Sequence, residues 1–261
     1  PHDSRLALGG NHMSAAVPST FEEKLKRALV PPRLDLMRVT WREMWRGEPE
    51  LRILPFLLDR SRAAMDIGAN RGIWANVMAR HCETVWAFEP NPKLFNTLTS
   101  ATGSKVRCFP DALSDKIGEA SLMVPGANKR FSNQGASLSE TKIKSAPHIT
   151  VPVRQSTLDS LSPPPTGLLK IDVEGHERAV LDGARDLIAR DRPNLMVEIE
   201  ENHTGRSIDE ELDFIENLGY RTFVLKHGQL VGRPQFVPAT DHHIRPGSPG
   251  YINNFIFLPR D

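Results

Sequence analysis

The sequence predicts an α/β fold built on a doubly wound, mostly parallel β-sheet. From residue 63 onward, short apolar runs alternate with amphipathic segments, and glycines or helix-capping residues separate the two kinds of segment. This alternation with short connections is typical of repeated βαβ units, which place parallel strands in one sheet. Because the ligands of such sheets bind beyond the carboxyl ends of the strands, we expect the functional residues at that edge.

Apolar runs of strand length mark the expected sheet. The predicted buried strands are residues 63–67, 85–88, 106–109, 168–173 and 195–199. The amphipathic segments between them predict helices at residues 73–80, 92–99 and 177–189. Ser207 and Glu210 then form a capping box for a further helix, which Gly219 ends before a strand at 221–225. The final apolar run, 255–258, is expected to add a strand at the edge of the sheet.

The N-terminal part of the chain does not share this alternation. Residues 1–12 lack hydrophobic periodicity and end in a His12-Met13 junction typical of a cloning scar, so we interpret them as an expression-tag remnant. Residues 13–60 contain a capping box followed by an apolar, Trp-containing stretch, and we expect them to form an N-terminal helical cap. Residues 61–261 then form the α/β domain.

One interval of this domain is too long for an ordinary strand-to-helix connection. Residues 114–160 are rich in Gly, Ser, Asn and Lys. We expect a short hairpin in this interval and a substrate loop at residues 118–149. The polar segment 128–135 is interpreted as a lid over the acceptor, because a hydroxyl-rich substrate needs hydrogen-bonding groups of this kind.

Composition and charge narrow the classes of partner. The formal net charge is +1, from 33 basic and 32 acidic residues. Since no long run of one sign is present, the sequence gives no electrostatic indication of nucleic-acid binding. Cys82 and Cys108 are the only cysteines and lack metal-ligand spacing, which favours a reducing, cytoplasmic location. No apolar run reaches the length of a membrane span, and no secretory signal is recognisable.

The segment Met65-Asp66-Ile67-Gly68-Ala69-Asn70-Arg71-Gly72 carries the sharpest local signal, a predicted strand that runs through a glycine turn into a helix. Gly68 and Gly72 permit a tight turn and a close approach of the backbone to a ligand. Asp66 suits the ammonium group of a ligand better than a pyrophosphate, which favours a nucleotide bearing an amino acid over NAD. The third glycine of the dinucleotide fingerprint is also missing. We predict that Asp66, Gly68, Ala69, Asn70 and Gly72 bind this cofactor.

Two further strand ends are predicted to face the same ligand. Glu89, in the segment Phe88-Glu89-Pro90-Asn91, ends the second strand at about the spacing of a ribose-binding carboxylate. Asp111 and Ala112 follow the third strand, where a carboxylate and a backbone amide are placed to read an adenine edge. The alternative is a generic α/β fold in which acidic residues at strand ends only cap helices.

A charged series ends the fourth predicted strand, from Lys170 to Glu177. Lys170, Asp172 and Glu174 share one face at a spacing of two, and three charges on one face of a buried strand favour a functional site. The alternative is structural: Glu174 and Glu177 favour the start of the next helix, while Lys170 pairs with Asp172. On the fifth strand, Glu198 and Glu200, followed by His203, extend this acidic rim, and the alternative is that they are ordinary solvated residues of a helix or loop.

These motifs resemble the FkbM family of methyltransferases. The resemblance rests on Asp66 to Gly72, Glu89-Pro90-Asn91, Ala112-Leu113-Ser114, Val151-Pro152-Val153 with Thr157-Leu158-Asp159, and Lys170 to Glu177, within about residues 48–200. It implies a Rossmann-like, seven-stranded class I methyltransferase fold over residues 61–261. It also implies S-adenosylmethionine as the cofactor and O-methylation of a sugar, a glycolipid or a polyketide-type hydroxyl.

Methyl transfer to a hydroxyl requires the acceptor oxygen to be held about 3 to 3.5 Å from the methyl carbon and its proton to be removed. Asp172 is our first candidate for this task, with Glu174, His176 and Glu198 around it. An alternative is a divalent ion, magnesium or calcium, held by Asp172 and Glu198 with His203 as a further candidate ligand, which would lower the pKa of the acceptor.

Other functional classes stay open at this point. An NAD-dependent oxidoreductase or epimerase is disfavoured by the missing third glycine. A non-catalytic module that binds the cofactor and works through a partner would leave Lys170 to Glu177 merely structural. A nucleic-acid methyltransferase is disfavoured by the near-zero charge and by the absence of an Asn/Asp-Pro-Pro-aromatic segment. We therefore expect a small-molecule, glycan or glycolipid acceptor and no nucleic acid.

Overall fold

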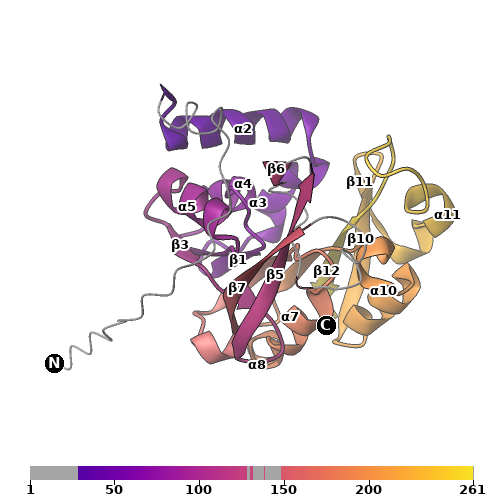
Figure 1. Ribbon diagram of the computed structural model, residues 1–261. Coiled ribbons are helices and arrows are strands. Elements are labelled where there is room, and N and C mark those ends of the chain that lie inside the picture. Colours follow the sequence, from indigo (N-terminus) through magenta and orange to yellow (C-terminus); the bar gives the residue numbers. More distant parts are fainter. Residues whose placement is uncertain (1–28, 128–129, 132–137, 139–147, 261) are drawn as a thin grey trace.

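A computed structural model of the protein describes residues 29–127, 130–131, 138 and 148–260 (Figure 1). Within these residues, eight strands form one mixed sheet in the order β11-β10-β12-β9-β8-β1-β2-β3. Five neighbouring strands are parallel: β9 (Asn194–Glu198), β8 (Thr166–Ile171), β1 (Ala63–Ile67), β2 (Val85–Phe88) and β3 (Val106–Phe109). The other three pair antiparallel: β12 (Asn254–Pro259), β10 (Tyr220–Lys226) and β11 (Gln229–Gly232).

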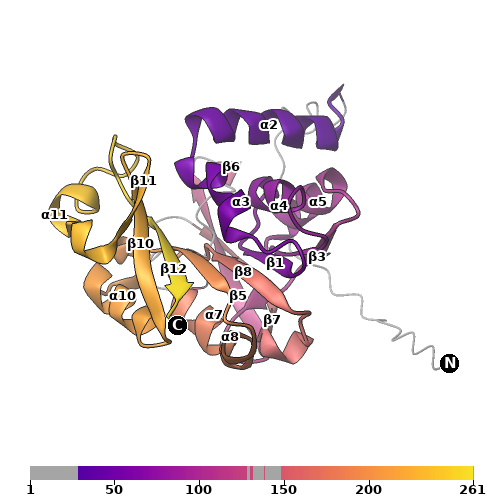
Figure 2. The same cartoon turned by 180° about the vertical axis from the view of Figure 1, so that it is seen from behind.

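Helices cover both faces of this sheet, as Figures 1 and 2 show. One layer contains α3 (Leu54–Leu57), α4 (Ile73–Met78) and α5 (Pro92–Ala101). The opposite layer contains α7 (Glu177–Asp182), α8 (Arg185–Asp191) and α10 (Ile208–Glu216). In β1, Ala64 packs into the first layer, whereas Met65 and Ile67 pack into the second. This alternation follows from the two-residue period of a strand and confirms the doubly wound α/β fold.

The N-terminal region packs over the first helical layer. Helix α2 (Pro32–Arg46) lies against α4 and α5, and the 3-10 helix η1 (Pro49–Arg52) connects it to α3. The described part of the expected helical cap is therefore helical. The capping box within residues 13–28 and the interpretation of residues 1–12 as a tag remnant lie outside the described residues.

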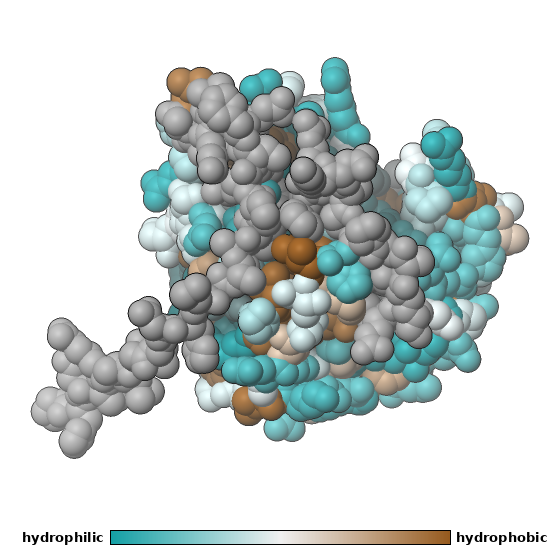
Figure 3. All heavy atoms as spheres, in the orientation of Figure 1, coloured by the Kyte–Doolittle hydropathy of each residue, from teal (hydrophilic) through white to brown (hydrophobic). Residues whose placement is uncertain are grey.

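The interval after β3 forms a second, smaller sheet. Here β5 (Gly118–Ala127) pairs antiparallel with β7 (His148–Ser156), and the order is β4-β7-β5-β6, with β4 at Ala112–Leu113 and β6 at Arg130–Phe131. The first part of the substrate loop predicted at 118–149 is thus a long strand. In Figure 3 a hydrophobic patch lies over this β5–β7 hairpin, with mostly hydrophilic residues below it. The lid predicted at 128–135 lies outside the described residues, except for the backbone of β6.

Three predicted elements differ from the structure. The run at 255–258 is not an edge strand, because β12 lies between β9 and β10 with Phe255, Ile256 and Phe257 fully buried. The helix expected at 177–189 is two helices, α7 and α8. They separate at Gly183, where an added Cβ would lie 1.9 Å from the carbonyl oxygen of Ser114. Strand β11 makes the described main sheet eight-stranded instead of seven-stranded.

Four short elements complete the described fold. They are the 3-10 helices η2 (Asp159–Leu161) and η3 (Arg233–Gln235), and the helices α9 (Glu201–Thr204) and α11 (Pro238–Asp241). The capping box expected for α10 is present, since the side chains of Ser207 and Glu210 each accept a hydrogen bond from the other residue's backbone N–H.

Candidate functional site

A cleft lies at the carboxyl ends of β1, β2 and β8, where the parallel sheet predicts a ligand site. It contains about 670 Å³ of space, part of which is open to solvent. Its lining residues are Ile67, Gly68, Asn70, Phe88, Glu89, Pro90, Leu94, Asp111, Ala112, Leu113, Leu122, Leu138, Asp172, Val173, Glu174 and His176. We call it the cofactor cleft. Most of the residues predicted to bind cofactor or substrate are therefore together in one place.

The glycine turn after β1 brings two strand ends into contact. Gly68 has a φ of +84°, and a Cβ at this position would lie 1.8 Å from the carbonyl oxygen of Asp172. Its backbone N–H donates to the carbonyl oxygen of Phe88. Only glycine fits such a position, because the left-handed conformation and the close approach both exclude a side chain. The turn thus fixes the floor of the cofactor cleft.

Three residues predicted to bind cofactor, Asp66, Ala69 and Gly72, are not among the residues that line the cofactor cleft. Asp66 is fully buried, and one carboxylate oxygen accepts a hydrogen bond of 2.8 Å from the backbone N–H of Ala75. The other oxygen has no hydrogen-bond partner among the described residues. Burial raises the pKa of Asp66 to about 6. Its predicted contact with a ligand ammonium group stays a prediction.

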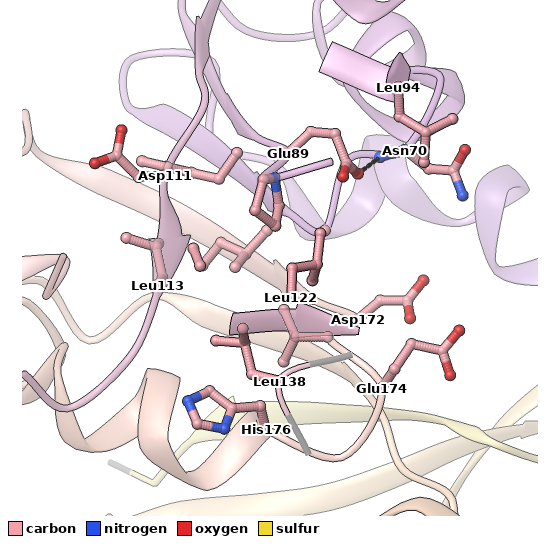
Figure 4. A pocket seen from close by; sticks show the side chains of 16 residues that line it. Asn70, Glu89, Leu94, Asp111, Leu113, Leu122, Leu138, Asp172, Glu174 and His176 are labelled. Atoms are coloured by element: carbon pink, nitrogen blue, oxygen red, sulfur yellow. Dashed lines mark hydrogen bonds between the residues drawn. The ribbon is translucent and has the colours of Figure 1, made fainter. Parts of the chain in front are cut away.

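Glu89 lies on the wall of the cofactor cleft, and neighbouring backbone N–H groups hold its carboxylate in place. Its two carboxylate oxygens accept hydrogen bonds of 2.8 Å from the backbone N–H groups of Asn70 and Asn91, the first of which is drawn in Figure 4. The residue is 6% exposed, and burial raises its pKa to about 7. A carboxylate oxygen can accept more than one hydrogen bond, so this arrangement leaves Glu89 able to bind a hydroxyl in the cleft.

Asp111 is tied to the β5–β7 hairpin. Its buried carboxylate accepts hydrogen bonds from the Nη2 atom of Arg154 at 2.7 Å and the hydroxyl of Ser156 at 2.8 Å, both on β7. In Figure 4 this carboxylate points away from Glu89. The side chain predicted to read adenine is therefore engaged by the protein. The neighbouring Ala112 contributes to the cleft wall as expected.

The charged series after β8 contains a buried ion pair. The Nζ atom of Lys170, which is 1% exposed, lies 2.8 Å from Oδ2 of Asp172. Burial alone would lower the pKa of Lys170, but Asp172, Asp66 and nearby glutamates outweigh it and raise this pKa above its ordinary value. Lys170 therefore forms the ion pair with Asp172 that the structural alternative predicts. Asp172 nevertheless lines the cofactor cleft, which is the position predicted for it.

Glu174 and His176 lie on a tight turn between β8 and α7. Glu174 has a φ of +59°, and its carboxylate lies 3.1 Å from Nδ1 of His203. The Nε2 atom of His176 lies 2.8 Å from the hydroxyl of Ser114, and burial lowers the pKa of this imidazole. In Figure 4 Asp172 and Glu174 extend toward one side of the cleft, whereas His176 points the other way. His176 therefore does not converge with Asp172 and Glu174 on one point.

Glu198, the last predicted catalytic residue, lies in a second cleft. Its side chain accepts a hydrogen bond of 3.0 Å from Asn253, and burial, followed by the charge of Asp172, raises its pKa well above the ordinary value. The cleft lies between the N-terminal helices and residues 240–254, and we call it the outer cleft. Its polar lining includes Glu48, Glu198, Glu200, Ser248, Tyr251, Asn253 and Asn254.

Sequence reasoning missed Tyr251, Asn253 and Asn254. The hydroxyl of Tyr251 donates to Glu200, and Asn254 lies opposite Glu198 in the pairing of β12 with β9. Because β12 is antiparallel, its first residues reach the edge where β9 ends. The available signal was the pair of asparagines directly before the buried apolar run. If that run is an inner strand, polar side chains at its start lie at the ligand-binding edge of the sheet.

The magnesium alternative finds no support in the described part of the chain. No group of three or more His, Cys, Asp or Glu side chains there is arranged to hold a metal ion. His203, one of the three suggested ligands, lies against Glu174 instead.

Comparison with solved structures finds proteins of related fold at low sequence identity. An FkbM methyltransferase from Methylobacillus flagellatus matches with a TM-score of 0.48 and 16% identity over 90% of this chain. The chain spans 57% of that protein. An rRNA methylase from Streptococcus thermophilus matches with a TM-score of 0.44 and 10% identity, over 82% of this chain and 95% of that one. No curated protein matches the sequence.

A further solved structure, a TehB-like SAM-dependent methyltransferase from Corynebacterium glutamicum, matches with a TM-score of 0.42 and 13% identity, over 88% of this chain and 100% of that one. The family comparison is decisive. The model of the methyltransferase FkbM domain matches residues 66–222, more than half of the chain and the whole region that forms the cofactor cleft. The chain belongs to the FkbM family of methyltransferases.

Proposed function

We propose that the protein is an S-adenosylmethionine-dependent O-methyltransferase acting on a hydroxyl-rich acceptor, such as a sugar, a glycolipid or a polyketide-type metabolite. Family membership supports methyl transfer. The observation that carries the proposal is the position of Asp172. It lines the cofactor cleft, and its charge acts on Glu198, a residue of the outer cleft. Two adjoining clefts give separate places to a methyl donor and an acceptor.

The residues of the cofactor cleft fit S-adenosylmethionine. Glu89 offers a carboxylate to the ribose hydroxyls, and the Gly68 turn allows the backbone close to the ligand. Apolar side chains, among them Phe88, Leu94 and Leu113, suit an adenine ring. Asp172 and Glu174 supply negative charge for the ammonium and sulfonium groups. The cofactor supplies an electrophilic methyl group when bound.

The protein must then place an acceptor oxygen in line and deal with its proton. Asp172 is held by Lys170, so its carboxylate is fixed in position and suited to orient a hydroxyl by accepting its hydrogen bond. Glu198 has a raised pKa, and a carboxyl group of this kind takes up a proton at a higher pH than an ordinary glutamate. We assign orientation to Asp172 and proton removal to Glu198 or Asp172.

The outer cleft supports a hydroxyl-rich acceptor. Its lining combines carboxylates with the neutral groups of Tyr251, Asn253 and Asn254. Amide and hydroxyl groups both donate and accept hydrogen bonds, as sugar hydroxyls do, so the two surfaces match in chemistry. Polyketide-type metabolites are the second class of candidate acceptor. They also carry hydroxyl groups, but on a more apolar molecule.

Parallel calorimetric titration with S-adenosylmethionine and NAD tests the cofactor. We expect binding of the former alone, whereas binding of NAD alone would favour an oxidoreductase or epimerase. Transfer of a radiolabelled methyl group to hydroxyl-bearing sugars and glycolipids, with ribosomal and transfer RNA beside them, then tests the acceptor. Label in RNA would overturn the acceptor class. Cofactor binding without transfer to any acceptor would favour the non-catalytic module.

A further inference from the structure

Helix α2 lies on the outside of the first helical layer (Figure 2) and exposes an apolar stripe. Leu34, Met37, Trp41 and Trp45 are 58%, 55%, 68% and 67% exposed. Their spacing of three and four residues places them on one face of the helix. The opposite face packs inward, as the burial of Leu36 shows. Large side chains gathered in this way mark an interaction surface.

Arginines follow this stripe along the helix. Arg38, Arg42 and Arg46 are spaced four residues apart, so they form a row beside the stripe, and all three are exposed. Arg33 adds a fourth exposed cation on α2. The helix carries only two acidic residues, Asp35 and Glu43, and Glu43 pairs with Arg42 at 2.8 Å. The surface is therefore both apolar and cationic.

We propose that the outer face of α2 docks onto an anionic lipid surface, with Trp41 and Trp45 at headgroup level and the arginine row on the headgroup phosphates. Tryptophan is enriched where apolar and polar phases meet, and guanidinium groups bind phosphate in two-point contacts. An amphipathic helix of this composition lies in the plane of the interface. No helix in the described residues is long and apolar enough to cross a membrane.

Charge favours lipid over a second copy of the chain. In a two-fold symmetric dimer through α2, the same surface would face itself, so the two rows of Arg38, Arg42 and Arg46 would approach each other. Like charges brought together in this way oppose association. Anionic headgroups satisfy the arginines and accept the tryptophans at the same time.

The position of α2 connects this surface with the proposed acceptor. Glu43, Arg46 and Gly47, at the carboxyl end of the helix, line the outer cleft. Docking would therefore bring the mouth of this cleft close to the lipid surface, where a glycolipid presents its headgroup. This link rests on the proposed function, whereas docking itself does not.

Vesicle binding tests the proposal, and the tryptophans report on it directly. The chain has four tryptophans, of which Trp74 and Trp86 are each only 7% exposed. A blue shift of emission on binding would therefore come mainly from Trp41 and Trp45. The full chain is floated with vesicles of phosphatidylcholine, alone or mixed with phosphatidylglycerol, and its emission is recorded. We expect binding and a blue shift with the anionic vesicles only.

The variants separate the two parts of the surface. Trp41→Gln with Trp45→Gln should weaken vesicle binding on the order of tenfold. Arg38→Gln with Arg42→Gln should weaken it about fivefold for each arginine at low salt. Ile117→Gln, which removes another exposed apolar side chain, and Arg80→Gln, which removes an exposed arginine, are the matched controls and should bind like the wild type. Circular dichroism checks that every variant folds.

Three results would overturn the docking proposal. They are failure of the wild type to bind anionic vesicles, equal binding to neutral vesicles, and undiminished binding in the tryptophan variant. Self-association in sedimentation that needs Trp41 and Trp45, without vesicle binding, would assign the surface to a second copy. Calorimetry with S-adenosylmethionine is run on the same variants. Because none of these residues lines the cofactor cleft, unchanged affinity there separates a failure of docking from a failure of the proposed function.

Discussion

The buried ammonium group of Lys170 lies 2.8 Å from the partly exposed carboxylate of Asp172. The same ammonium lies 5.2 Å from the ring centre of Trp74 and close to the buried Asp66. Removing one member of a buried ion pair leaves the other charge without compensation, which is strongly destabilising. The ion pair with Lys170 therefore fixes Asp172 at the wall of the cofactor cleft. The exposed part of the Asp172 carboxylate remains available to a ligand.

Asp172→Asn should reduce turnover by about 10²- to 10⁴-fold, the usual range for general acid–base assistance, while S-adenosylmethionine still binds. Asparagine keeps the shape of the side chain and can still accept a hydrogen bond from Lys170, but it lacks the charge. Single-turnover methyl transfer measures the rate, and calorimetry measures cofactor affinity. Full activity in this variant would refute the role of Asp172, and Glu198 or His176 would then be the group to test.

Treatment with EDTA should leave the turnover of the wild-type enzyme unchanged. The described residues contain no group of three or more side chains suited to a metal ion, so acceptor activation is expected to depend on Asp172 and its neighbours. Turnover is measured with EDTA alone and after addition of magnesium. Loss of activity with EDTA and recovery with magnesium would restore the metal alternative.

Glu89→Ala should weaken binding of S-adenosylmethionine by about 1 to 3 kcal/mol, the usual loss for a charge-assisted hydrogen bond and its unsatisfied partner. The variant also removes the acceptor for the backbone N–H groups of Asn70 and Asn91. Glu89→Gln is the matched variant, because its carbonyl oxygen can still accept one of these hydrogen bonds. Calorimetry gives the affinity and thermal unfolding gives the stability. An unchanged affinity in both variants would contradict ribose binding by Glu89.

Gly68→Ala should lower the free energy of unfolding by several kcal/mol and abolish cofactor binding. A non-glycine residue in a left-handed conformation costs about 1 kcal/mol or more, and the Cβ would also lie 1.8 Å from the carbonyl oxygen of Asp172. Gly103→Ala is the control, since a Cβ there has no atom within 4 Å. Urea unfolding of both variants measures the difference. Equal stability would show that the β1 turn and the end of β8 are not in this close contact.

Glu177→Gln should make the protein more stable above pH 7. Glu177 is 4% exposed; one carboxylate oxygen accepts a hydrogen bond from the backbone N–H of Gly175, and the other has no partner among the described residues. Burial raises its pKa from 4.5 to about 7. A raised pKa means that the native state binds more protons, so the stability from this group is present below pH 4.5 and is lost as the pH rises through 7.

Urea unfolding at pH 5 and pH 8 measures this effect. The fall in stability between the two values should be smaller in Glu177→Gln than in the wild type, by up to a few kcal/mol. Glu119→Gln, at an exposed position, controls for the removal of one carboxylate. The same fall in the wild type and in Glu177→Gln would show that Glu177 does not carry this pH dependence.

The sequence predicted the parallel half of the sheet most accurately. Strands β1, β2 and β3 have the predicted bounds, because each is a short apolar run between clear turn residues. Strand β12 was placed wrongly, since its order in the sheet depends on antiparallel pairing with β9 and β10, which no local pattern encodes. The break at Gly183 was missed for a similar reason. It follows from contact with Ser114, which is far away in the sequence.

For the site, the sequence predicted the position of the cofactor cleft more accurately than it predicted the hydrogen-bond partners of the residues there. Glu89, Gly68 and Asp172 lie on the cleft wall because each follows a parallel strand, and a strand's end is readable locally. A hairpin was expected within residues 114–160, but no local pattern indicated that it would bring Arg154 against Asp111. Asn254, the first residue of β12, was missed for the same physical reason, because its place at this edge depends on pairing with the distant strand β9.

The bond between Asp111 and Arg154 also bears on how the protein is made. The two residues are 43 positions apart, so during synthesis Asp111 leaves the ribosome before Arg154 does. Until β7 emerges, the carboxylate that the finished fold buries must stay in water, because burying an unpaired charge is costly. Contacts between distant residues also form more slowly than local ones. The wall of the cofactor cleft is therefore completed late, and a chain stopped before Arg154 should expose this edge to chaperones and proteases.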